Sequence, residues 1–92
     1  MTSTIFIIIL NWNGKDNTIE CLESVNRLQS TDYSLQTIVV DNGSDEEFSP
    51  PAGGSEFRID RLKIIRNKEN LGFAGGNNVG IRYALKQGAD YI

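Results

Sequence analysis

Residues 4–10 read Thr-Ile-Phe-Ile-Ile-Ile-Leu, and this stretch decides the fold. It is a continuous run of β-branched and aromatic residues without polar alternation, which is typical of a strand buried on both faces of a parallel sheet. Two further apolar runs, residues 35–40 and 62–66, have the same character. Because helical patterns follow the first and third runs, the sequence predicts an open α/β sheet with helices on its faces.

Two helices are expected around these strands. The first is predicted from about residue 18 to 29, opened by a capping pair of Asn17 and Glu20. The second is predicted from about residue 73 to 87 and closed by Gly88 just past its C-terminus. Its apolar stripe at helical spacing is expected to comprise Ala74, Asn78, Ile81 and Leu85.

The whole chain, residues 1–92, is expected to be one incomplete domain, since 92 residues fall below the usual size of about 100–150. The stretch from about residue 45 to 57 is rich in acids, Pro and Gly and is expected to form a flexible surface loop. Asp90-Tyr91-Ile92 reads as the beginning of a fourth strand, and the chain stops there without a closing turn. We therefore expect a truncated sheet, whose open edge predicts self-association.

Composition excludes several classes of protein. Nine Lys and Arg against twelve Asp and Glu give a net charge of −3, and the charged residues are scattered along the chain. Both features disfavour nucleic acid as a partner. A single cysteine, Cys21, and no histidine exclude an internal disulfide, a Cys/His zinc cluster and His-dependent nucleophilic catalysis. The longest apolar run, residues 5–10, is too short for a membrane span of about 20 residues, so a cytoplasmic protein is expected.

Three polar loops follow the strands directly, at residues 11–14, 41–44 and 67–76, and the carboxyl ends of parallel strands are where ligands bind. Asp41 is placed to accept a hydrogen bond from the imide of a pyrimidine base, although spacing alone favours the commoner role of an Asx-turn. Trp12, flanked by Asn11 and Asn13, is suited to stack on a base or to cover the first helix. These alternatives stay open on the residues alone.

The third loop concentrates glycines around the start of a helix, where free N–H groups favour an anion such as a diphosphate. It matches neither the dinucleotide nor the P-loop fingerprint, so close helix–sheet packing is the alternative. Asn78 interrupts the predicted apolar stripe and serves either as a brace or as a ligand contact. Arg66, directly after a strand, is a candidate for neutralising a phosphate, whereas the acidic run 45–47 reads as a solvated loop.

Residues 7–14 (Ile-Ile-Ile-Leu-Asn-Trp-Asn-Gly), residues 39–44 (Val-Val-Asp-Asn-Gly-Ser) and residues 66–81 together resemble the amino-terminal half of family 2 glycosyltransferases. The nearest likeness is to the rhamnosyltransferase-like branch, and it covers residues 4–92. The resemblance implies a Rossmann-like sheet of the GT-A fold and a nucleotide-diphosphate sugar as the donor. It also implies an acceptor glycan or lipid-linked saccharide, as in polysaccharide biosynthesis.

In such enzymes the aromatic residue after the first strand and the Asp after the second contact the nucleoside, and Trp12 and Asp41 match these positions. Asn70, Gly72, Asn78 and Gly80 match the family's pattern that shapes the loop and helix beneath the nucleotide. Where relatives carry Pro-Thr-Tyr-Asn, this chain has Leu-Asn-Trp-Asn, so the base and the sugar stay open. The residues expected to bind the nucleotide sugar are Asn11, Trp12, Asp41, Asn42, Gly72 and Asn78.

Relatives continue past Gly-Ala-Asp-Tyr-Ile into a D-x-D-like motif that binds Mg²⁺ or Mn²⁺. No catalytic or metal-binding residue is therefore expected in residues 1–92, and the chain alone is expected to be inactive. The full-length enzyme is expected in the cytoplasm or at the inner face of the membrane. The alternative hypothesis is a nucleotide-binding or regulatory module that works without catalysis.

Overall fold

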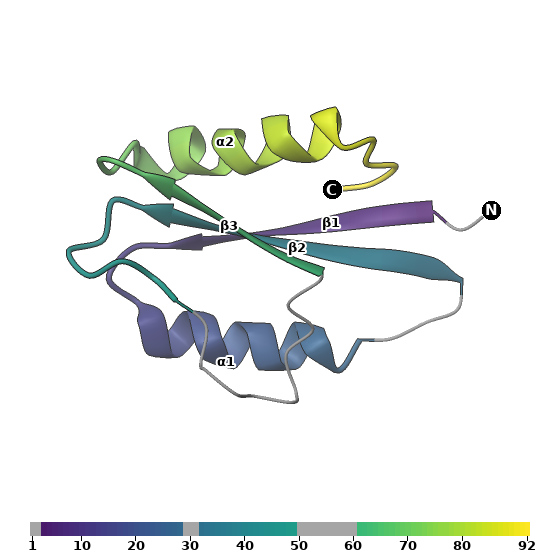
Figure 1. Cartoon of the computed structure of the whole chain (residues 1–92), viewed down its shortest axis with the longest axis horizontal. Coiled ribbons are helices and arrows are strands. Elements are labelled where there is room, and N and C mark those ends of the chain that lie inside the picture. The colour runs from purple at the N-terminus through teal and green to yellow at the C-terminus, as the bar shows by residue number, and fades with distance from the viewer. Residues whose placement is uncertain (1–2, 29–31, 50–60) are drawn as a thin grey trace.

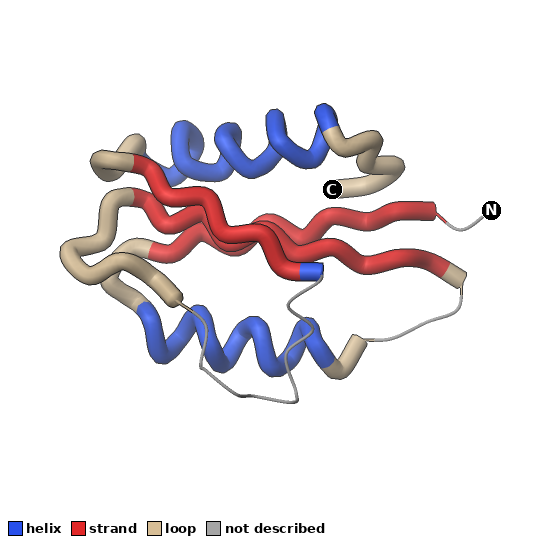
Figure 2. Tube along the Cα trace, viewed as in Figure 1, coloured by secondary structure: helices blue, strands red, loops and turns tan. Residues whose placement is uncertain are grey.

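The computed structural model describes residues 3–28, 32–49 and 61–92. Three parallel strands, β1 (Ser3–Asn11), β2 (Tyr33–Asn42) and β3 (Leu62–Asn67), form one sheet in the order β1-β2-β3. In this register Asn11 pairs with Asp41, and Asp41 pairs with Arg66 on its other side. All three strands therefore end at the same edge of the sheet, where the loops gather (Figure 2).

Two helices cover the sheet, α1 (Lys15–Asn26) on one face and α2 (Gly72–Lys86) on the other (Figure 1). This is the open parallel α/β architecture that the sequence predicts. Neither helix in the described part of the chain is long and apolar enough to cross a membrane.

The core lies in two layers because side chains alternate between the faces of a strand. Ile38 and Val40 of β2 pack with Phe6 and Ala84 on the α2 side of the sheet. Val39, between them, packs with Leu22 and Phe48 on the α1 side. The three β2 residues have no exposed surface. The unbroken apolar runs of the sequence thus reflect a sheet that is covered on both faces.

Helix α2 approaches the sheet through its glycines. A Cβ atom on Gly80 would lie 2.8 Å from Cγ2 of Ile8 and 3.0 Å from Cγ2 of Val40, closer than van der Waals contact allows. Gly76 is similarly enclosed, and its added Cβ would lie 2.6 Å from Cδ1 of Leu10. Close helix–sheet packing, one of the two interpretations of the glycine-rich segment, is therefore confirmed.

The predicted apolar stripe of α2 is wrong. Ala74, Asn78 and Leu85 are exposed, and Leu85 keeps 62% of its surface accessible. The buried face instead comprises Gly76, Gly80 and Ala84. A search for large apolar side chains overlooks glycine, although here the missing side chains are what allow the two backbones to come together.

Helix α1 begins and ends about three residues earlier than predicted. It starts at Lys15 rather than Thr18, and the Thr18 amide donates to the Gly14 carbonyl oxygen at 2.9 Å. The capping pair of Asn17 and Glu20 is therefore wrong, since both residues lie inside the helix. The helix ends at Asn26, and the predicted last residue, Gln29, lies outside the described residues.

The remaining predicted boundaries agree with the structure. Gly88 follows the end of α2 with a φ of +82°, the conformation expected of a glycine past a helix C-terminus. Tyr91 forms a parallel bridge with Ile5 on the side of β1 away from β2. Residues 45–49 have no regular secondary structure, as expected, but Phe48 is buried. Residues 50–57 of the predicted loop lie outside the described residues.

The close approach of α2 to the sheet predicts that an alanine at Gly80 destabilises the protein, although helix propensity alone would predict a gain in stability. Gly80→Ala should lower the free energy of unfolding by about 1–2 kcal/mol, because overpacking against Ile8 and Val40 outweighs the propensity gain of about 1 kcal/mol. The exposed Asn78→Ala should instead be neutral or stabilising by a few tenths of a kcal/mol, on the order of its propensity difference. Urea unfolding of both variants checks this, and a Gly80→Ala protein as stable as the parent contradicts it.

Candidate functional site

A buried carboxylate lies where the three strands end. Asp41 has no exposed surface, and both of its oxygens are saturated with hydrogen bonds. Its Oδ1 atom accepts from Oγ of Ser44 at 2.5 Å and from Nδ2 of Asn11 at 3.2 Å. Its Oδ2 atom accepts from the Phe48 amide at 2.8 Å and from Nη1 of Arg66 at 2.6 Å. An ionised carboxylate has about four acceptor positions, and here all are filled.

These partners determine the charge state of Asp41. Burial by itself raises the pKa of the carboxyl group, but the hydrogen bonds from Ser44, Phe48 and Asn11 and the charge of Arg66 lower it. The lowering effects prevail, so the pKa of Asp41 lies below its ordinary value of 3.8. The carboxylate is therefore ionised at neutral pH and paired with Arg66.

The network continues from Asp41 into α1 and the first loop. Oδ1 of Asn11 accepts from the Thr18 hydroxyl at 2.6 Å, which ties the end of β1 to the first turns of α1. Oγ of Ser44 accepts from the Asn13 amide, and the Asn13 side chain accepts from the Asp45 amide, both at 2.9 Å. Each of the loops after β1 and β2 therefore donates a backbone amide to a side chain of the other loop.

A second network surrounds the next residue, Asn42, which is 1% exposed. Its Oδ1 atom accepts from Nδ2 of Asn67 and from the Leu71 amide, both at 3.0 Å. Its Nδ2 atom donates to Oδ1 of Asn70 at 3.0 Å and to the Gly72 carbonyl oxygen at 3.1 Å. The Asn42 amide thus uses its full hydrogen-bonding capacity, one bond on the end of β3 and three on the chain where it enters α2.

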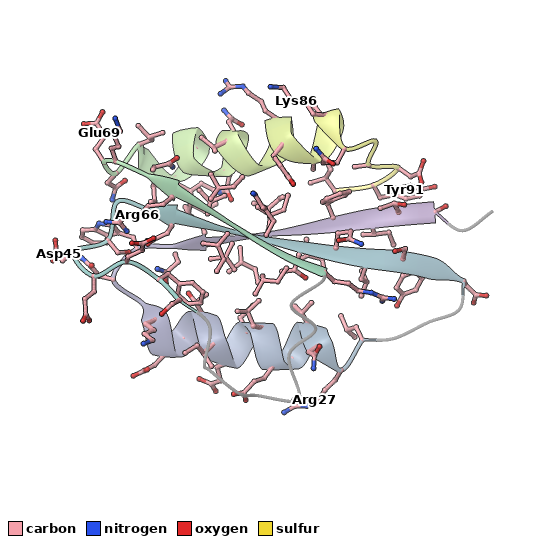
Figure 3. All side chains as sticks on the ribbon, viewed as in Figure 1. Arg27, Asp45, Arg66, Glu69, Lys86 and Tyr91 are labelled. Carbon is pink, nitrogen blue, oxygen red and sulfur yellow. The ribbon has the colours of Figure 1, made fainter. Side chains whose placement is uncertain are left out.

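The accessible surface at this edge lies beside the two networks. Trp12 follows β1 and is 56% exposed. A pocket of about 280 Å³ opens between the first two loops, lined by Asn11, Asn13, Lys15, Ser44, Asp45, Glu46 and Phe48. Figure 3 shows Asp45 and Arg66 at this edge and Tyr91 at the opposite end of the sheet. An exposed aromatic ring and a pocket between the two loops are therefore available to a ligand.

The structure brings most of the predicted site residues to one edge. Asn11 and Asp41 contact each other, and Trp12 follows directly on the same edge. Asn42 and Gly72 meet in the second network. Asn78 does not join them. It is exposed on α2 and takes part in neither network, so its predicted place on an apolar face is wrong.

Sequence reasoning missed part of this arrangement. Ser44 was not among the predicted site residues, although the spacing of Asp41 and Ser44, three residues apart after a strand, is a turn signal. The composition of residues 45–57 predicts a surface loop around Phe48, but the side chain of this lone aromatic residue is only 3% exposed. Arg66, a candidate for binding phosphate, directs its guanidinium to Asp41 and to the Ser44 carbonyl oxygen.

Within residues 3–28, 32–49 and 61–92, no group of three His, Cys, Asp or Glu side chains is arranged to hold a metal ion. The acidic residues at the pocket, Asp45 and Glu46, are exposed, and Asp41 is already saturated. These residues do not form a metal centre by themselves.

Comparisons with known proteins identify a family and a relative of the chain. Residues 6–92 match the family model described as Glycosyl transferase family 2. Over 69 residues the chain is 36% identical to a protein named hyaluronan synthase, from Pasteurella multocida. This alignment covers 73% of the chain but 6% of the relative, so the chain spans a small fraction of that protein's length. No solved structure matches the chain significantly.

The buried carboxylate leads to a prediction about stability. Asp41→Asn should lower the free energy of unfolding at pH 7 by about 2 kcal/mol or more, because Arg66 and the Phe48 amide lose a charged acceptor. The pKa of Asp41 is lower in the folded than in the unfolded chain. Its stabilisation is therefore complete above about pH 5 and is lost as the pH falls below 3.8 and through the folded pKa.

Urea unfolding between pH 7 and pH 2.5 tests this dependence. The difference in stability between the parent and Asp41→Asn should narrow at the acidic end. The exposed Asp45→Asn provides the control, with an expected change within about 0.5 kcal/mol. A difference between the parent and Asp41→Asn that is constant over the whole pH range would contradict the assignment.

Proposed function

The chain belongs to glycosyl transferase family 2, and we propose that it is the nucleotide-binding portion of a glycosyltransferase that takes a nucleotide-diphosphate sugar as donor. The supporting observation is the edge of the sheet, where the network around Asp41 joins all three strand ends beside an exposed tryptophan. Ligands of open α/β sheets bind at this edge. The sugar is transferred to a hydroxyl group of the acceptor.

In this proposal the base stacks on Trp12, and the imide N–H of a uracil or thymine base donates to Asp41. Asn11 holds the Asp41 carboxylate from β1, and Asn42 positions Gly72 at the start of α2. The Leu71 and Gly72 amides already donate to the side chains of Asn42 and Asn70. A diphosphate close to this helix start would therefore rely on the following amides of the first turn and on the positive end of the helix dipole. Asn78 lies outside both networks, and its contact with the nucleotide rests on the family resemblance alone.

Transfer of the sugar needs a metal site and a catalytic base in addition to the residues that bind the donor. The metal expected for this family is not accommodated by the described residues, which contain no cluster of metal ligands. Asp41 is also unsuited to act as the catalytic base, since its oxygens are saturated and its pKa is lowered. We therefore propose that this chain contributes donor binding and that the metal site and the base belong to the longer enzyme.

The acceptor is proposed to be a growing glycan or a lipid-linked saccharide. The likeness to a protein named hyaluronan synthase supports a role in polysaccharide biosynthesis. The rhamnosyltransferase-like branch stays a prediction, which a comparison of dTDP-rhamnose with UDP-sugars as donors would test. A purely regulatory nucleotide-binding module is the alternative, and membership in an enzyme family does not favour it.

Donor binding can be followed through the chain's single tryptophan. UDP and dTDP should change the fluorescence of Trp12, whereas CDP should bind more weakly because cytosine has no imide hydrogen to donate to Asp41. Trp12→Ala should weaken UDP binding by about tenfold in calorimetry, since stacking contributes about 1–3 kcal/mol per base. The matched control is Tyr91→Ala, which removes an exposed aromatic side chain at the other end of the sheet.

Equal affinity for UDP and CDP would contradict the proposed contact with Asp41. An unchanged affinity of Trp12→Ala for UDP would contradict the stacking. Binding of neither UDP nor dTDP at millimolar concentration, by the parent chain or by any folded variant of it, would contradict the proposed function as a whole.

The purified 92-residue chain is expected to bind the donor without transferring its sugar, even with Mg²⁺ or Mn²⁺ added. The physical reason is that the described residues contain no metal-ligand cluster and that Asp41, the carboxylate at the strand ends, is already saturated with hydrogen bonds. Release of UDP from UDP-sugars and of dTDP from dTDP-rhamnose, in the presence of candidate acceptors, measures transfer. Metal-dependent release above the rate of the protein-free control would show that the chain carries its own catalytic groups.

A further inference from the structure

The proposed role of Asp41 meets a physical obstacle, and the inference below rests on the proposed function. Four donors already occupy the carboxylate, and no part of Asp41 is accessible to solvent. A fifth donor from a nucleoside has no lone pair to bind. One of the four present donors must therefore leave before the base can contact Asp41.

The segment of residues 44–48, here called the latch, contributes two of these donors. Its first residue, Ser44, and its last, Phe48, hold opposite oxygens of Asp41. The three residues between them are exposed. The Phe48 side chain anchors the latch in the apolar cluster with Leu22 and Val39. The latch thus closes over Asp41 and forms part of the pocket wall.

The donors differ in how easily they can be replaced. Asn11 and Ser44 are buried and bonded to each other at 3.2 Å, so removing either breaks several bonds. Arg66 supplies the charge that balances the carboxylate. The Phe48 amide is a neutral donor at the end of a segment whose preceding three residues are exposed. A base imide is also a neutral N–H donor, so its hydrogen bond to Asp41 would replace that of the Phe48 amide.

We propose that the latch competes with the nucleoside for Asp41. In the free protein the Phe48 amide holds the Oδ2 atom, and the nucleotide binds by displacing it. The apparent affinity is then the intrinsic affinity reduced by the fraction of molecules in which the latch is open. Phe48 consequently stabilises the free protein and weakens nucleotide binding at the same time.

A pair of variants tests whether Phe48 both stabilises the free protein and weakens nucleotide binding. Phe48→Ala should be less stable than the parent but should bind UDP about tenfold more tightly or better, because the closed state has lost its anchor. Phe6→Ala removes a buried aromatic side chain from the core cluster on the other face of the sheet. It should be less stable as well, but its affinity for UDP should be unchanged. The milder pair Phe48→Leu and Phe6→Leu serves if the alanine variants do not fold.

Equal or weaker binding of UDP by folded Phe48→Ala or Phe48→Leu would overturn the proposal while leaving the proposed function intact. Binding by the Phe48 variant but not by the parent would support the latch in its strongest form. Binding by none of the proteins, variants included, would contradict the proposed function itself.

Hydrogen exchange on the unmodified chain gives a second readout that does not depend on a variant. The Phe48 amide, bonded to Asp41 at 2.8 Å, should be protected in the free protein and should exchange faster when UDP saturates the site. The Val39 amide in β2 should keep its protection. A Phe48 amide that stays protected in the UDP complex would overturn the proposal.

Discussion

The structure depends on one buried charge. A carboxylate removed from water is costly unless charged and hydrogen-bonding partners replace its hydration. Asp41 obtains these partners from β1, from the latch and from β3, so the carboxylate is satisfied only when all three are in place. The same requirement that stabilises Asp41 therefore fixes the relative positions of the strand ends, and with them the edge at which a ligand would bind.

The alternation of side chains along β2 explains why two networks exist. Asp41 and Asn42 are consecutive, so they face opposite sides of the sheet. Asp41 joins Asn11 and Phe48 on the α1 side, whereas Asn42 joins Asn70 and Gly72 at the start of α2. Each helix is thus connected to the edge of the sheet through a different residue of β2. Two adjacent polar residues at the end of one strand organise both faces.

Sequence patterns predicted the strands and α2 well because runs of β-branched residues and a glycine past a helix end act locally. The patterns did not predict helix bounds and burial where these depend on contacts between residues distant in the sequence. Helix α1 begins at Lys15, and Thr18, which the pattern makes its first residue, lies inside it, with its amide bonded to Gly14 and its hydroxyl to the distant Asn11. The buried face of α2 consists of two glycines and Ala84, and a count of large apolar side chains does not detect it. Phe48 looked like part of a solvated loop because the cluster that buries it comes from elements distant in sequence.

Each residue of the turn Asp41-Asn42-Gly43-Ser44 has a separate structural task. Gly43 has a φ of +77°, and a Cβ there would lie 2.5 Å from the carbonyl carbon of Glu69, so only glycine lets the loops after β2 and β3 touch. Its three neighbours are committed to hydrogen bonds inside the free protein. Because no side chain of this turn is free to reach further, any discrimination between donor sugars beyond the base would depend on exposed groups around the turn, among them Trp12, Lys15 and Asp45.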